Sequence, residues 1–313
     1  MLVTGGSGFI GQAVLARLAG ERHMIVRTAV RRDSPGALVG AERILVGDIC
    51  DTTSWGKALE NVSCVIHLAA RVHILRDRAA DPLAEYRRVN VEGTLNLARH
   101  AAKAGVRRFI YLSSLKVNGE VGSFTETDLA APQDAYAISK HEAEVGLREI
   151  ARTTGMQVVI IRPTLVYGKG AKGNFKSLMS LVARGLPLPL GSINNFRSFV
   201  GIDNLVDFII TCLEHPTAAN ETFLVSDGED LSTPDLIRRM ARAMNRPARL
   251  LPVPTFVLKA VAATLGRCGM AQRLCGSLQV DISKSRQLLG WNPPFSVDEG
   301  LKRAVGGNWR LGN

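Results

Sequence analysis

Short, nearly continuous hydrophobic runs alternate with helix-like patterns through the first half of the chain. Runs such as Cys64–Leu68 and Val158–Ile161 are typical of parallel strands buried on both faces of a sheet. We expect strands at Met1–Val3, Met24–Arg31, Arg43–Gly47, Val62–Ala69, Arg107–Ser113 and Gln157–Arg162. Helical patterns separate them at Phe9–Leu18, Trp55–Leu59, Leu83–Ala104 and Ala135–Thr153. This alternation predicts an α/β fold, a doubly wound parallel sheet whose ligands bind at the carboxyl ends of the strands.

The pattern changes after Gly168, where Gly and Pro interrupt shorter elements. We therefore expect a first domain over residues 1–168, a smaller α/β lobe over 169–305 and a tail over 306–313, with a chain that can cross between the lobes. Helices are expected in the smaller lobe near Thr233–Met244, Phe256–Leu265 and Val297–Ala304. The stretch Phe256–Leu265 is apolar apart from Lys259 and predicts a buried or amphipathic helix, with contact to a membrane surface as the alternative.

Composition narrows the class of protein. With 313 residues and 46% hydrophobic content the chain can bury a large core. No apolar run reaches the roughly 20 residues that span a bilayer, and Met1 already begins a strand, so we expect no transmembrane segment and no signal peptide. The five cysteines are odd in number and lack CxxC spacing, which argues against a disulfide framework or a metal site and favours a cytoplasmic location.

The formal net charge is +11, but no Lys/Arg block exceeds two residues and aromatic residues make up only 5%. A nucleic-acid-binding protein would show a basic run with interleaved aromatics. The charge therefore favours anionic small molecules as ligands, not nucleic acid.

A glycine-rich turn, Thr4–Gly11, joins the first expected strand to the first expected helix. Gly5, Gly8 and Gly11 recur every three residues, where a tight turn or a close ligand leaves no room for a Cβ. The helix that begins at Phe9 and Ile10 would point its free N–H groups at a phosphate over the turn. The turn therefore predicts a dinucleotide pyrophosphate site, and a plain strand-to-helix turn is the alternative.

The end of the second expected strand bears on the choice of dinucleotide. A free ribose 2′-hydroxyl is matched there by an acid and a 2′-phosphate by arginine. The chain has Arg31 and Arg32, followed by Asp33. Guanidinium groups bind phosphate through paired charge-assisted hydrogen bonds, so this site favours NADP(H) over NAD(H). The alternative is NAD(H) with its ribose on Asp33. Asp48, after the third strand, can accept from the adenine amino group or be an ordinary turn residue.

Tyr136 and Lys140 lie four residues apart on one expected helix and so share a face. A cationic Lys140 favours the phenolate, which would lower the pKa of Tyr136 and make it a usable proton donor or acceptor. A third group is needed to orient a substrate oxygen. Ser113 and Ser114, at the end of the fifth expected strand, can supply it.

Together these motifs resemble the extended short-chain dehydrogenase/reductases, and more narrowly the NAD-dependent epimerase/dehydratase branch that acts on nucleotide sugars. The resemblance rests on Thr4–Gly11, Gly47-Asp48, His67–Ala70, Asn90, Ser113-Ser114, Tyr136–Lys140, Arg162-Pro163, Tyr167-Gly168 and Leu289–Pro293. It implies a Rossmann domain for the dinucleotide, a lobe for a UDP-sugar and a homodimer formed through two helices. It also implies a catalytic triad of Ser114, Tyr136 and Lys140. Ser114 is chosen over Ser113 because Val117-Asn118-Gly119 aligns with the family's Val-Tyr-Gly.

The resemblance extends to the ligand contacts. It implies that the dinucleotide is bound by Gly5, Gly8, Phe9, Ile10, Gly11, Arg31, Arg32, Asp48, Ile49, Leu68, Ala69, Ala70, Tyr136, Lys140 and Pro163. For the sugar nucleotide it implies Lys116, Asn118, Asn174, Leu188, Pro189, Arg197 and Arg273. The segment at Leu188–Leu190 resembles the one whose backbone brackets uracil, and Arg197 matches an arginine that grips the pyrophosphate. A surface lysine at Lys116, loop arginines and a helix-capping Asn174 are the corresponding structural alternatives.

Two departures from the family pattern refine the activity. Family dehydratases carry Asp-Glu after the catalytic Ser/Thr, whereas this chain has Leu115-Lys116, which cannot perform carboxylate acid–base chemistry. Asn118 replaces a Tyr. The run Ser113–Glu120 resembles a subgroup of bacterial O-antigen synthesis, a lipopolysaccharide pathway, that reduces UDP-4-keto-6-deoxy-N-acetylhexosamine. We therefore expect an NADPH-dependent 4-ketoreductase that gives a product such as UDP-N-acetylquinovosamine. The alternative is a UDP-hexose 4-epimerase with bound NAD, and a non-catalytic NADP-sensing module is more distant because the triad is intact.

Overall fold

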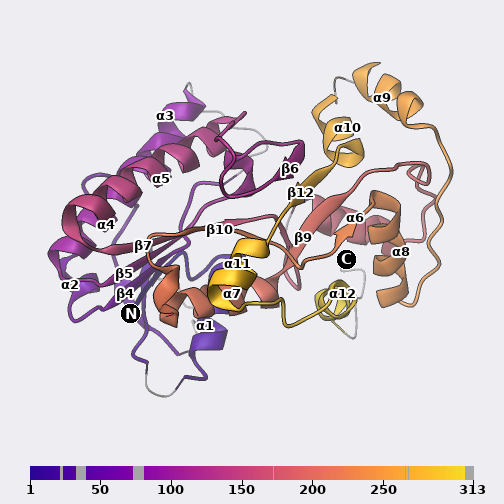
Figure 1. The fold of residues 1–313 in the computed structure, drawn as a ribbon. Coiled ribbons are helices and arrows are strands. Elements are labelled where there is room, and N and C mark those ends of the chain that lie inside the picture. Colours follow the sequence, from indigo (N-terminus) through magenta and orange to yellow (C-terminus); the bar gives the residue numbers. More distant parts are fainter. Residues whose placement is uncertain are drawn as a thin grey trace.

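The computed structural model describes residues 1–21, 24–32, 40–72, 81–171, 173–264, 266 and 268–306. Its main feature is a seven-stranded sheet with the order β10-β7-β5-β4-β1-β2-β3, in which every neighbouring pair is parallel (Figure 1). The strands are β1 (Leu2–Thr4), β2 (Arg27–Val30), β3 (Glu42–Leu45), β4 (Cys64–His67), β5 (Arg108–Leu112), β7 (Gln157–Pro163) and β10 (Thr222–Val225). The predicted doubly wound α/β sheet is therefore confirmed.

Helices cover both faces of this sheet, as the continuous apolar strands require. On one face Val14 of α1 (Phe9–Leu18) and Phe208 of α7 (Ile202–Glu214) join the same buried cluster. On the other face a second cluster holds Leu97 of α4 (Thr94–Lys103), Leu147 of α5 (Ala135–Thr154) and Ala58 of α2 (Gly56–Leu59). The predicted helix over 83–104 is observed as α3 (Pro82–Arg87), a π-helical stretch η1 (Arg88–Gly93) and α4.

Helix α5 shows how local sequence sets the bounds of an element that carries the site. Asp134 caps its start, because the Asp134 side chain accepts a hydrogen bond from the N–H of Ala137 at 2.8 Å. Gly155 ends it in the left-handed conformation, with φ 72°. These two residues fix a 20-residue helix that begins at the carboxyl edge of the sheet with Tyr136 and Lys140 in its first turns.

Part of the main sheet comes from the second half of the chain, which the sequence did not predict. Strand β10 pairs with β7 in the register Thr222↔Ile160, and α7 packs beneath the sheet. Helix α11 (Ser283–Leu289) lies beside β10 and places Leu289 in the same buried cluster as α7. The chain therefore crosses between the two lobes, and the division at residue 168 remains a prediction.

The second lobe is built on a smaller sheet with the order β11-β9-β12-β6, with β8 paired to β9. Its strands are β6 (Gly122–Phe124), β8 (Leu165–Tyr167), β9 (Arg197–Gly201), β11 (Asp230–Leu231) and β12 (Leu278–Val280). Its helices are α6 (Asn174–Ala183), α8 (Thr233–Ala243), α9 (Thr255–Thr264), α10 (Cys268–Cys275) and α12 (Val297–Val305). Phe175, Met240 and Leu301 meet in its core.

Helix α9 is not the buried helix that was one expectation for this stretch, because none of its residues is buried. The helix stands at the edge of the smaller lobe next to α10, far from the main sheet (Figure 1). Within the described ranges, no helix is both long and apolar enough to cross a membrane.

Candidate active site

The glycine turn lies against the end of β4, and this contact explains its composition. The backbone N–H of Ala69 donates to Thr4 Oγ1 at 3.2 Å. A Cβ on Gly5 would lie 2.7 Å from the nitrogen of Ala69, and Gly5 has φ 71°. A Cβ on Gly11 would lie 2.1 Å from the carbonyl oxygen of Gly5. Only glycine fits at these two positions, so the turn brings α1 directly over the ends of β1 and β4.

The start of α1 is open to a ligand. Its N-cap residue is Gly8, which has no side chain to accept hydrogen bonds from the first turn. The N–H groups of Phe9 and Ile10 therefore face the turn at the positive end of the helix dipole. An uncapped helix above a glycine cradle that a Cβ would fill fits the pyrophosphate of a dinucleotide. Leu68, just after β4, borders the same turn, because a Cβ on Gly5 would lie 2.8 Å from its carbonyl carbon, and Ala70 follows two residues later.

The residues expected at the adenosine end lie together at the ends of β2 and β3. Arg31 and Arg32 are both exposed, and an ion pair joins Arg31 Nη1 to Asp48 Oδ1 at 3.5 Å. The side chains of this pair are 71% and 69% exposed, so water screens it and a ligand can displace it. Ile49 packs beside Gly93, where a Cβ would approach Ile49 Cγ2 to 2.6 Å. Asp33 lies outside the described residues.

His67 connects the start of the glycine turn to helix α4 through hydrogen bonds on both ring nitrogens. Its Nδ1 is 2.7 Å from Thr4 Oγ1 and its Nε2 is 2.9 Å from Thr94 Oγ1, and the ring is buried. Burial, and secondarily the charge of Lys140, lowers the pKa of His67 to about 3. The imidazole is therefore neutral at pH 7 and acts as a buried hydrogen-bonding link.

Tyr136 and Ser114 meet at the carboxyl ends of β5 and β7. Their side chains share a hydrogen bond, and Ser114 Oγ also accepts from the N–H of Lys116 at 3.3 Å. Burial raises the pKa of Tyr136 above its ordinary value, and the bond to Ser114 only partly opposes this effect. The expectation that the Tyr136 pKa is lowered is therefore wrong, because burial outweighs the hydrogen bond to Ser114.

Lys140 lies below Tyr136 on the same helix and is buried. Its Nζ donates to the carbonyl oxygen of Leu112 at 2.7 Å and stands 4.3 Å from the centre of the Tyr111 ring. Burial lowers the pKa of Lys140 to about 7, against the opposing effect of Glu144. Lys140 can therefore change charge near neutral pH. Pro163, at the end of β7, is buried at the same edge of the sheet.

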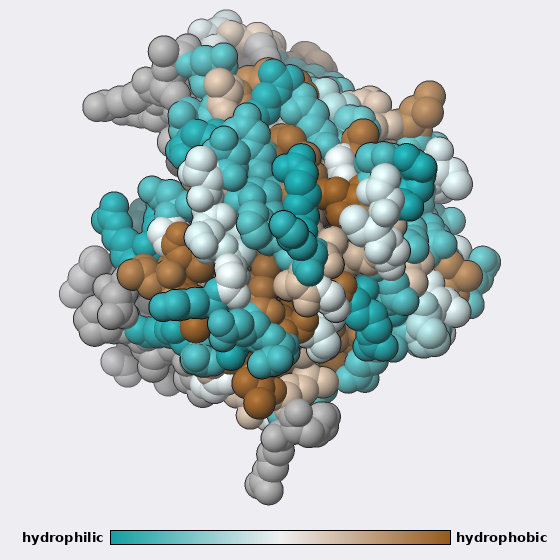
Figure 2. Space-filling model, turned by 90° about the vertical axis from the view of Figure 1, so that its left-hand side faces the viewer, coloured by the Kyte–Doolittle hydropathy of each residue, from teal (hydrophilic) through white to brown (hydrophobic). Residues whose placement is uncertain are grey.

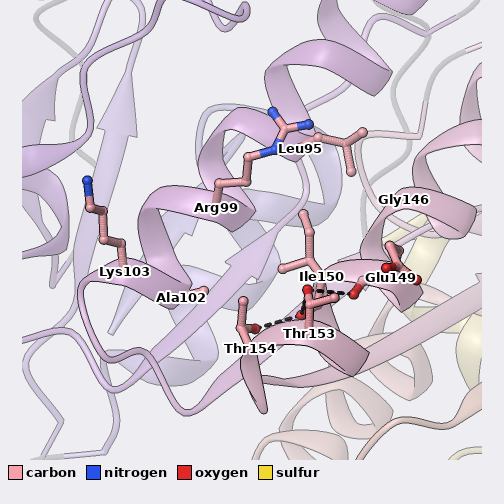
Figure 3. A pocket seen from close by; sticks show the side chains of 9 residues that line it. All are labelled: Leu95, Arg99, Ala102, Lys103, Gly146, Glu149, Ile150, Thr153 and Thr154. Atoms are coloured by element: carbon pink, nitrogen blue, oxygen red, sulfur yellow. Dashed lines mark hydrogen bonds between the residues drawn. The ribbon is translucent and has the colours of Figure 1, made fainter.

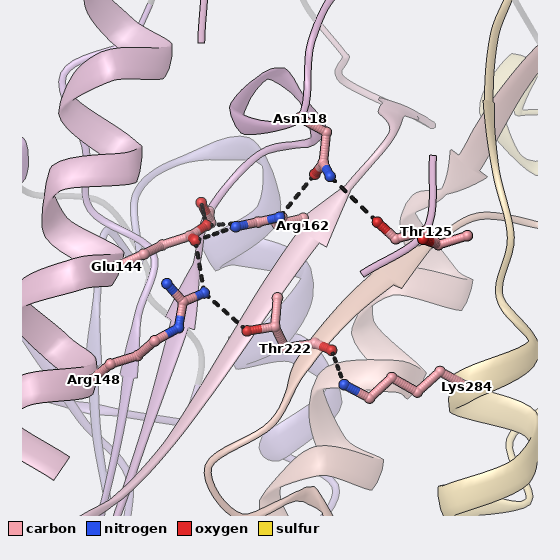
Figure 4. Close-up of polar contacts among 8 residues, drawn as sticks. Asn118, Thr125, Glu144, Arg148, Arg162, Thr222 and Lys284 are labelled. Atoms are coloured by element: carbon pink, nitrogen blue, oxygen red, sulfur yellow. Dashed lines mark hydrogen bonds and ion pairs between the residues drawn. The ribbon is translucent and has the colours of Figure 1, made fainter. Parts of the chain in front are cut away.

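Glu144 was not singled out by sequence reasoning, yet it connects the parts of the site (Figure 4). Its carboxylate accepts from Ser113 Oγ at 2.5 Å, from Arg162 Nε at 2.9 Å and from Arg148 Nη2 at 3.1 Å. Burial alone would raise the pKa of Glu144, but Arg162 and Ser113 outweigh it and hold that pKa below its usual value. A buried glutamate one turn beyond Lys140 thus fixes helix α5 to the ends of β5 and β7.

Asn118 belongs to this network and does not face an open pocket. It is buried, its Oδ1 accepts from Arg162 Nη1 at 2.9 Å, and its Nδ2 donates to the carbonyl oxygen of Thr125 at 3.4 Å (Figure 4). Both ends of the amide are therefore used within the protein, which gives Asn118 a structural role in place of the expected substrate contact.

Asn90 is a second residue whose role the pattern of the sequence did not reveal. It lies in the π-helical stretch η1 and is buried. Its Nδ2 donates to Ser139 Oγ at 3.0 Å and its Oδ1 accepts from the N–H of Arg71 at 2.8 Å. Single π-helical turns often occur at functional sites, and this one orients Asn90 towards α5 beside Tyr136 and Lys140.

Three basic residues expected to bind the sugar nucleotide gather around Glu120 in the second lobe. Lys116 Nζ donates to Glu120 Oε1 at 3.0 Å and also pairs with Asp134. Arg273 Nη2 is 4.0 Å from the same Glu120 oxygen, and the charge of Glu120 acts on the partly buried Arg197. Arg197 Nη1 also donates to the carbonyl oxygen of Gly276 at 2.9 Å. Lys116, Arg197 and Arg273 therefore lie around the carboxylate of Glu120, and Lys116 has Asp134 as a second anionic partner.

The remaining substrate candidates are more scattered. The N–H of Leu188 donates to the carbonyl of Arg249, and the carbonyl of Leu188 accepts from the N–H of Leu251, both at 2.8 Å. The backbone of Leu188 is thus occupied and cannot bracket a base as expected, whereas Pro189 is exposed. Asn174 is exposed at the first position of α6 and does not cap it, because the N-cap is Gly173.

A surface cavity of about 620 Å³ lies between α4 and α5, away from these residues (Figure 3). Its lining comes from Leu95, Arg99, Ala102, Lys103, Gly146, Glu149, Ile150, Thr153 and Thr154. These residues run along the length of α4 and the later turns of α5, and both helices lead from there to the amino ends of β5 and β7, the edge opposite Tyr136. The surrounding face is mostly hydrophilic with small hydrophobic patches (Figure 2). In the part of the chain that the structure describes, no cluster of three or more His, Cys, Asp or Glu residues could hold a metal ion.

Comparison with known protein families gives a match over residues 1–226 to the NAD dependent epimerase/dehydratase family. A Vibrio cholerae protein named UDP-glucose 4-epimerase is 48% identical, covering 97% of this chain and 94% of that protein. An Escherichia coli O157:H7 protein named N-acetyl-alpha-D-glucosaminyl-diphospho-ditrans,octacis-undecaprenol 4-epimerase is 28% identical over 97% of this chain and 94% of its own length.

Solved structures with the same fold include two sugar-nucleotide epimerases. UDP-glucuronic acid 4-epimerase from Bacillus cereus in complex with NAD has a TM-score of 0.77 and 22% identity, covering 97% of this chain and 94% of that one. UDP-glucose 4-epimerase from Thermotoga maritima with UDP-glucose has a TM-score of 0.75 and 24% identity, with 97% and 96% coverage. At this identity the likeness establishes the fold.

Proposed function

Because the chain belongs to the NAD-dependent epimerase/dehydratase family, we propose that it is a UDP-hexose 4-epimerase that works with bound NAD. The observation that carries the chemistry is the hydrogen-bonded pair Ser114 and Tyr136, above the buried Lys140 at the carboxyl ends of the strands. The choice of epimerisation is supported by the 48% identity to a protein named UDP-glucose 4-epimerase. This replaces the expected 4-ketoreductase as the leading function, since that relative is not named as an O-antigen 4-reductase.

The cofactor assignment changes in the same way. The glycine turn, the first turn of α1 and the end of β4 would hold the pyrophosphate, and Asp48 and Ile49 would border the adenine. The expected preference for NADP(H) has no support among the relatives, whereas the family is NAD-dependent and a structural neighbour binds NAD. With NAD bound, Arg31 and Arg32 would have no 2′-phosphate to bind and would stay exposed to solvent beside the ribose. Arg31 would keep its ion pair with Asp48.

The chain's own residues account for the proton transfers. Epimerisation at C4 needs the 4-hydroxyl to lose its proton while the C4 hydrogen leaves as hydride, and then both steps reverse on the other face of the ketone. When bound, the oxidised dinucleotide supplies a hydride acceptor and a positive charge that favours the Tyr136 phenolate. Tyr136 then accepts the 4-hydroxyl proton and later returns it to the C4 oxygen. Ser114 holds that oxygen, and a cationic Lys140 adds to the stabilisation of the phenolate.

In the second lobe, Arg197 and Arg273 would bind the UDP pyrophosphate, because a diphosphate can replace Glu120 as their anionic partner. Lys116 already forms ion pairs with Glu120 and Asp134, so it would not contact the diphosphate directly. It would contribute its positive charge to the electrostatic potential at the diphosphate site. Asn174 and Pro189 remain candidates for the uridine side of the site. We also propose a homodimer through the face of α4 and α5, on which Val145 is 53% exposed.

A 4-ketoreductase is the second candidate, and a specific observation favours it. Arg31 is exposed at the end of β2, where a guanidinium can bind the 2′-phosphate of NADPH. A reductase oxidises one reduced dinucleotide in each turnover. It therefore benefits from binding NADPH in a way that lets the oxidised product leave and a new NADPH enter. The non-catalytic module is less favoured still, because Ser114, Tyr136 and Lys140 lie together.

The test is to supply purified protein with UDP-glucose, or with UDP-N-acetylglucosamine, without any added cofactor, and to follow the C4 epimer by proton NMR. We expect the galacto epimer to form, with activity reduced about 10²–10⁴-fold in Tyr136→Phe. Glu142→Gln, at a partly exposed position of the same helix, is the matched control and keeps its activity. If the 4-keto sugar nucleotide oxidises NADPH and no epimer forms from either substrate, the reductase function replaces the proposal.

A further inference from the structure

One segment of the smaller lobe carries most of the excess positive charge of the chain. Between Leu236 and Val280 there are eight Lys or Arg residues and no Asp or Glu, against a formal net charge of +11 for the whole protein. The segment contains most of α8, all of α9 and α10, and β12. Its charge is therefore a local property of one side of the molecule.

Helix α9 lies in the middle of this segment and is apolar yet exposed. Its sequence, Thr255–Thr264, contains a single charge, at Lys259. Phe256 is 73% exposed and Val261 is 52% exposed. Phe256, Ala260 and Ala263 are all exposed and follow the i, i+4, i+7 spacing of one helix face. Helix α9 itself stands at the outer edge of the molecule (Figure 1).

The apolar surface continues beyond the helix. Leu251, four residues before α9, is 50% exposed. Its neighbour Leu250 pairs with Leu188, which brings the loop of the 44% exposed Leu186 alongside. We call Leu186, Leu251, Phe256, Ala260 and Ala263 the α9 patch. Single exposed hydrophobic residues are ordinary, but a gathered set on one side of a protein marks an interaction surface.

Free positive charges accompany the α9 patch. Arg242, Arg246, Arg249 and Lys259 are all exposed. Over the described part of the chain none of the four takes part in an ion pair, whereas Arg238 and Arg239 on α8 pair with Asp235 and Glu229. The long aliphatic stem of Lys259 can lie along an apolar layer while its ammonium reaches the polar surface.

We propose that the α9 patch docks this protein on the surface of an anionic lipid bilayer. An exposed apolar helix with basic residues and no acidic ones matches the two forces that hold a helix in the interface, burial of apolar side chains and attraction to anionic headgroups. A helix of 10 residues is about 15 Å long, so it lies in the interface and does not span the bilayer. The charge favours a bilayer over a second copy of the chain. In a twofold dimer the two basic segments would face each other and repel.

The test is co-sedimentation of the full chain with vesicles of phosphatidylglycerol and phosphatidylethanolamine, and with vesicles of phosphatidylcholine alone. We expect binding to the anionic vesicles that falls severalfold between about 0.1 M and about 0.5 M salt, with little binding to the neutral ones. Phe256→Ser should weaken the partition coefficient at least tenfold, and Lys259→Glu severalfold. Both variants should keep the wild-type activity on a substrate in solution, so the result does not depend on the proposed function.

The matched control is Ile25→Ser. Ile25 is 78% exposed, close to the 73% of Phe256, but its carbonyl binds the N-terminal amine at the far end of the molecule from α9 (Figure 1). Ile25→Ser should bind vesicles as the wild type does. The proposal is overturned if neither vesicle binds the wild type, if Phe256→Ser binds as well as Ile25→Ser, or if Phe256→Ser instead lowers the oligomeric mass in solution, which would show that a second copy covers α9.

Discussion

The hydroxyl of Ser113 donates a hydrogen bond of 2.5 Å to the carboxylate of Glu144, and both side chains are buried. Ser113 immediately precedes Ser114, and Glu144 lies one turn beyond Lys140 on the helix that also carries Tyr136. One buried bond therefore fixes the distance between the strand end and the helix that together form the candidate site. Arg162 completes the link from β7 with bonds to both Glu144 and Asn118.

Replacing Glu144 by Gln should destabilise the protein by about 3–5 kcal/mol, because Arg162 would remain buried without its counter-charge. The side chains of this pair are 0% and 5% exposed, so solvent cannot compensate. The free energy of unfolding from urea titration measures the effect. Because Glu144 also raises the pKa of Lys140, the alkaline limb of the pH–kcat/KM profile should move to lower pH in the same variant.

Glu142→Gln is the control on the same helix. Glu142 also binds an arginine through both oxygens, with 3.1 and 2.9 Å to Arg87 Nε, but its side chain is 32% exposed and that of Arg87 46%. Its loss should cost no more than about 1 kcal/mol. Equal costs for the two variants would contradict the structural role assigned to Glu144.

The adjacent serines should separate catalysis from stability. Ser114→Ala removes the partner of Tyr136 and should lower kcat about 10–100-fold, while stability falls by no more than about 1 kcal/mol through loss of the bond from the N–H of Lys116. Ser113→Ala removes a buried donor to Glu144 and should cost about 1–3 kcal/mol of stability while most of kcat is retained. The opposite assignment, with Ser113→Ala losing kcat, would place the catalytic serine one residue earlier.

The glycine turn can be tested with a pair of glycine variants. Gly11→Ala places a Cβ 2.1 Å from the carbonyl oxygen of Gly5, so it should cost about 1–3 kcal/mol and weaken NAD binding measured by calorimetry. Gly56→Ala, in the first turn of α2, meets nothing within 4 Å and should be neutral or slightly stabilising. Unchanged NAD affinity in Gly11→Ala would argue against a pyrophosphate site at this turn.

His67 should make stability sensitive to mild acid. Burial first, and then the charge of Lys140, lowers its pKa from 6.5 to about 3. Between these values the unfolded chain binds a proton that the native protein does not, so stability falls as the pH falls from 6.5 towards 3. The added slope is at most about 1.4 kcal/mol per pH unit. His67→Gln should lose this part of the slope in urea titrations at several pH values, and an unchanged slope would mean that native His67 is protonated in this range.

The sequence predicted the six strands that are observed as β1 to β5 and β7, and the helices between them, because each is a local pattern of hydrophobic residues. It missed β10, although Thr222–Val225 is apolar, because its place depends on pairing with β7 some 60 residues earlier in the register Thr222↔Ile160. It also treated Phe256–Leu265 as a buried or amphipathic helix. Hydrophobicity alone cannot say whether a helix has a neighbour to cover it, and α9 has no buried residue.

At the candidate site, motif spacing brought together the glycine turn, Ser114, Tyr136 and Lys140, which the structure places at one edge of the sheet. The sequence did not reveal Glu144, because a glutamate on a helix is ordinarily a surface residue. Only the fold shows that Arg162 from β7 neutralises its charge. The effect of Lys140 on Tyr136 was also misjudged, since the cost of burial cannot be read from spacing. The signal that could have revealed Glu144 is its position four residues after Lys140, on the buried face of α5.

The most direct measurement of the central claim follows the hydrogen at C4. UDP-glucose that carries deuterium at C4 is incubated with the purified protein in ordinary water, without added cofactor, and the products are analysed by NMR and mass spectrometry. We predict that UDP-galactose forms with the deuterium retained at C4, because the hydride leaves and returns within one bound complex. Epimer that has lost its deuterium to solvent, or no epimer at all while a 4-keto sugar nucleotide oxidises NADPH, would contradict the account.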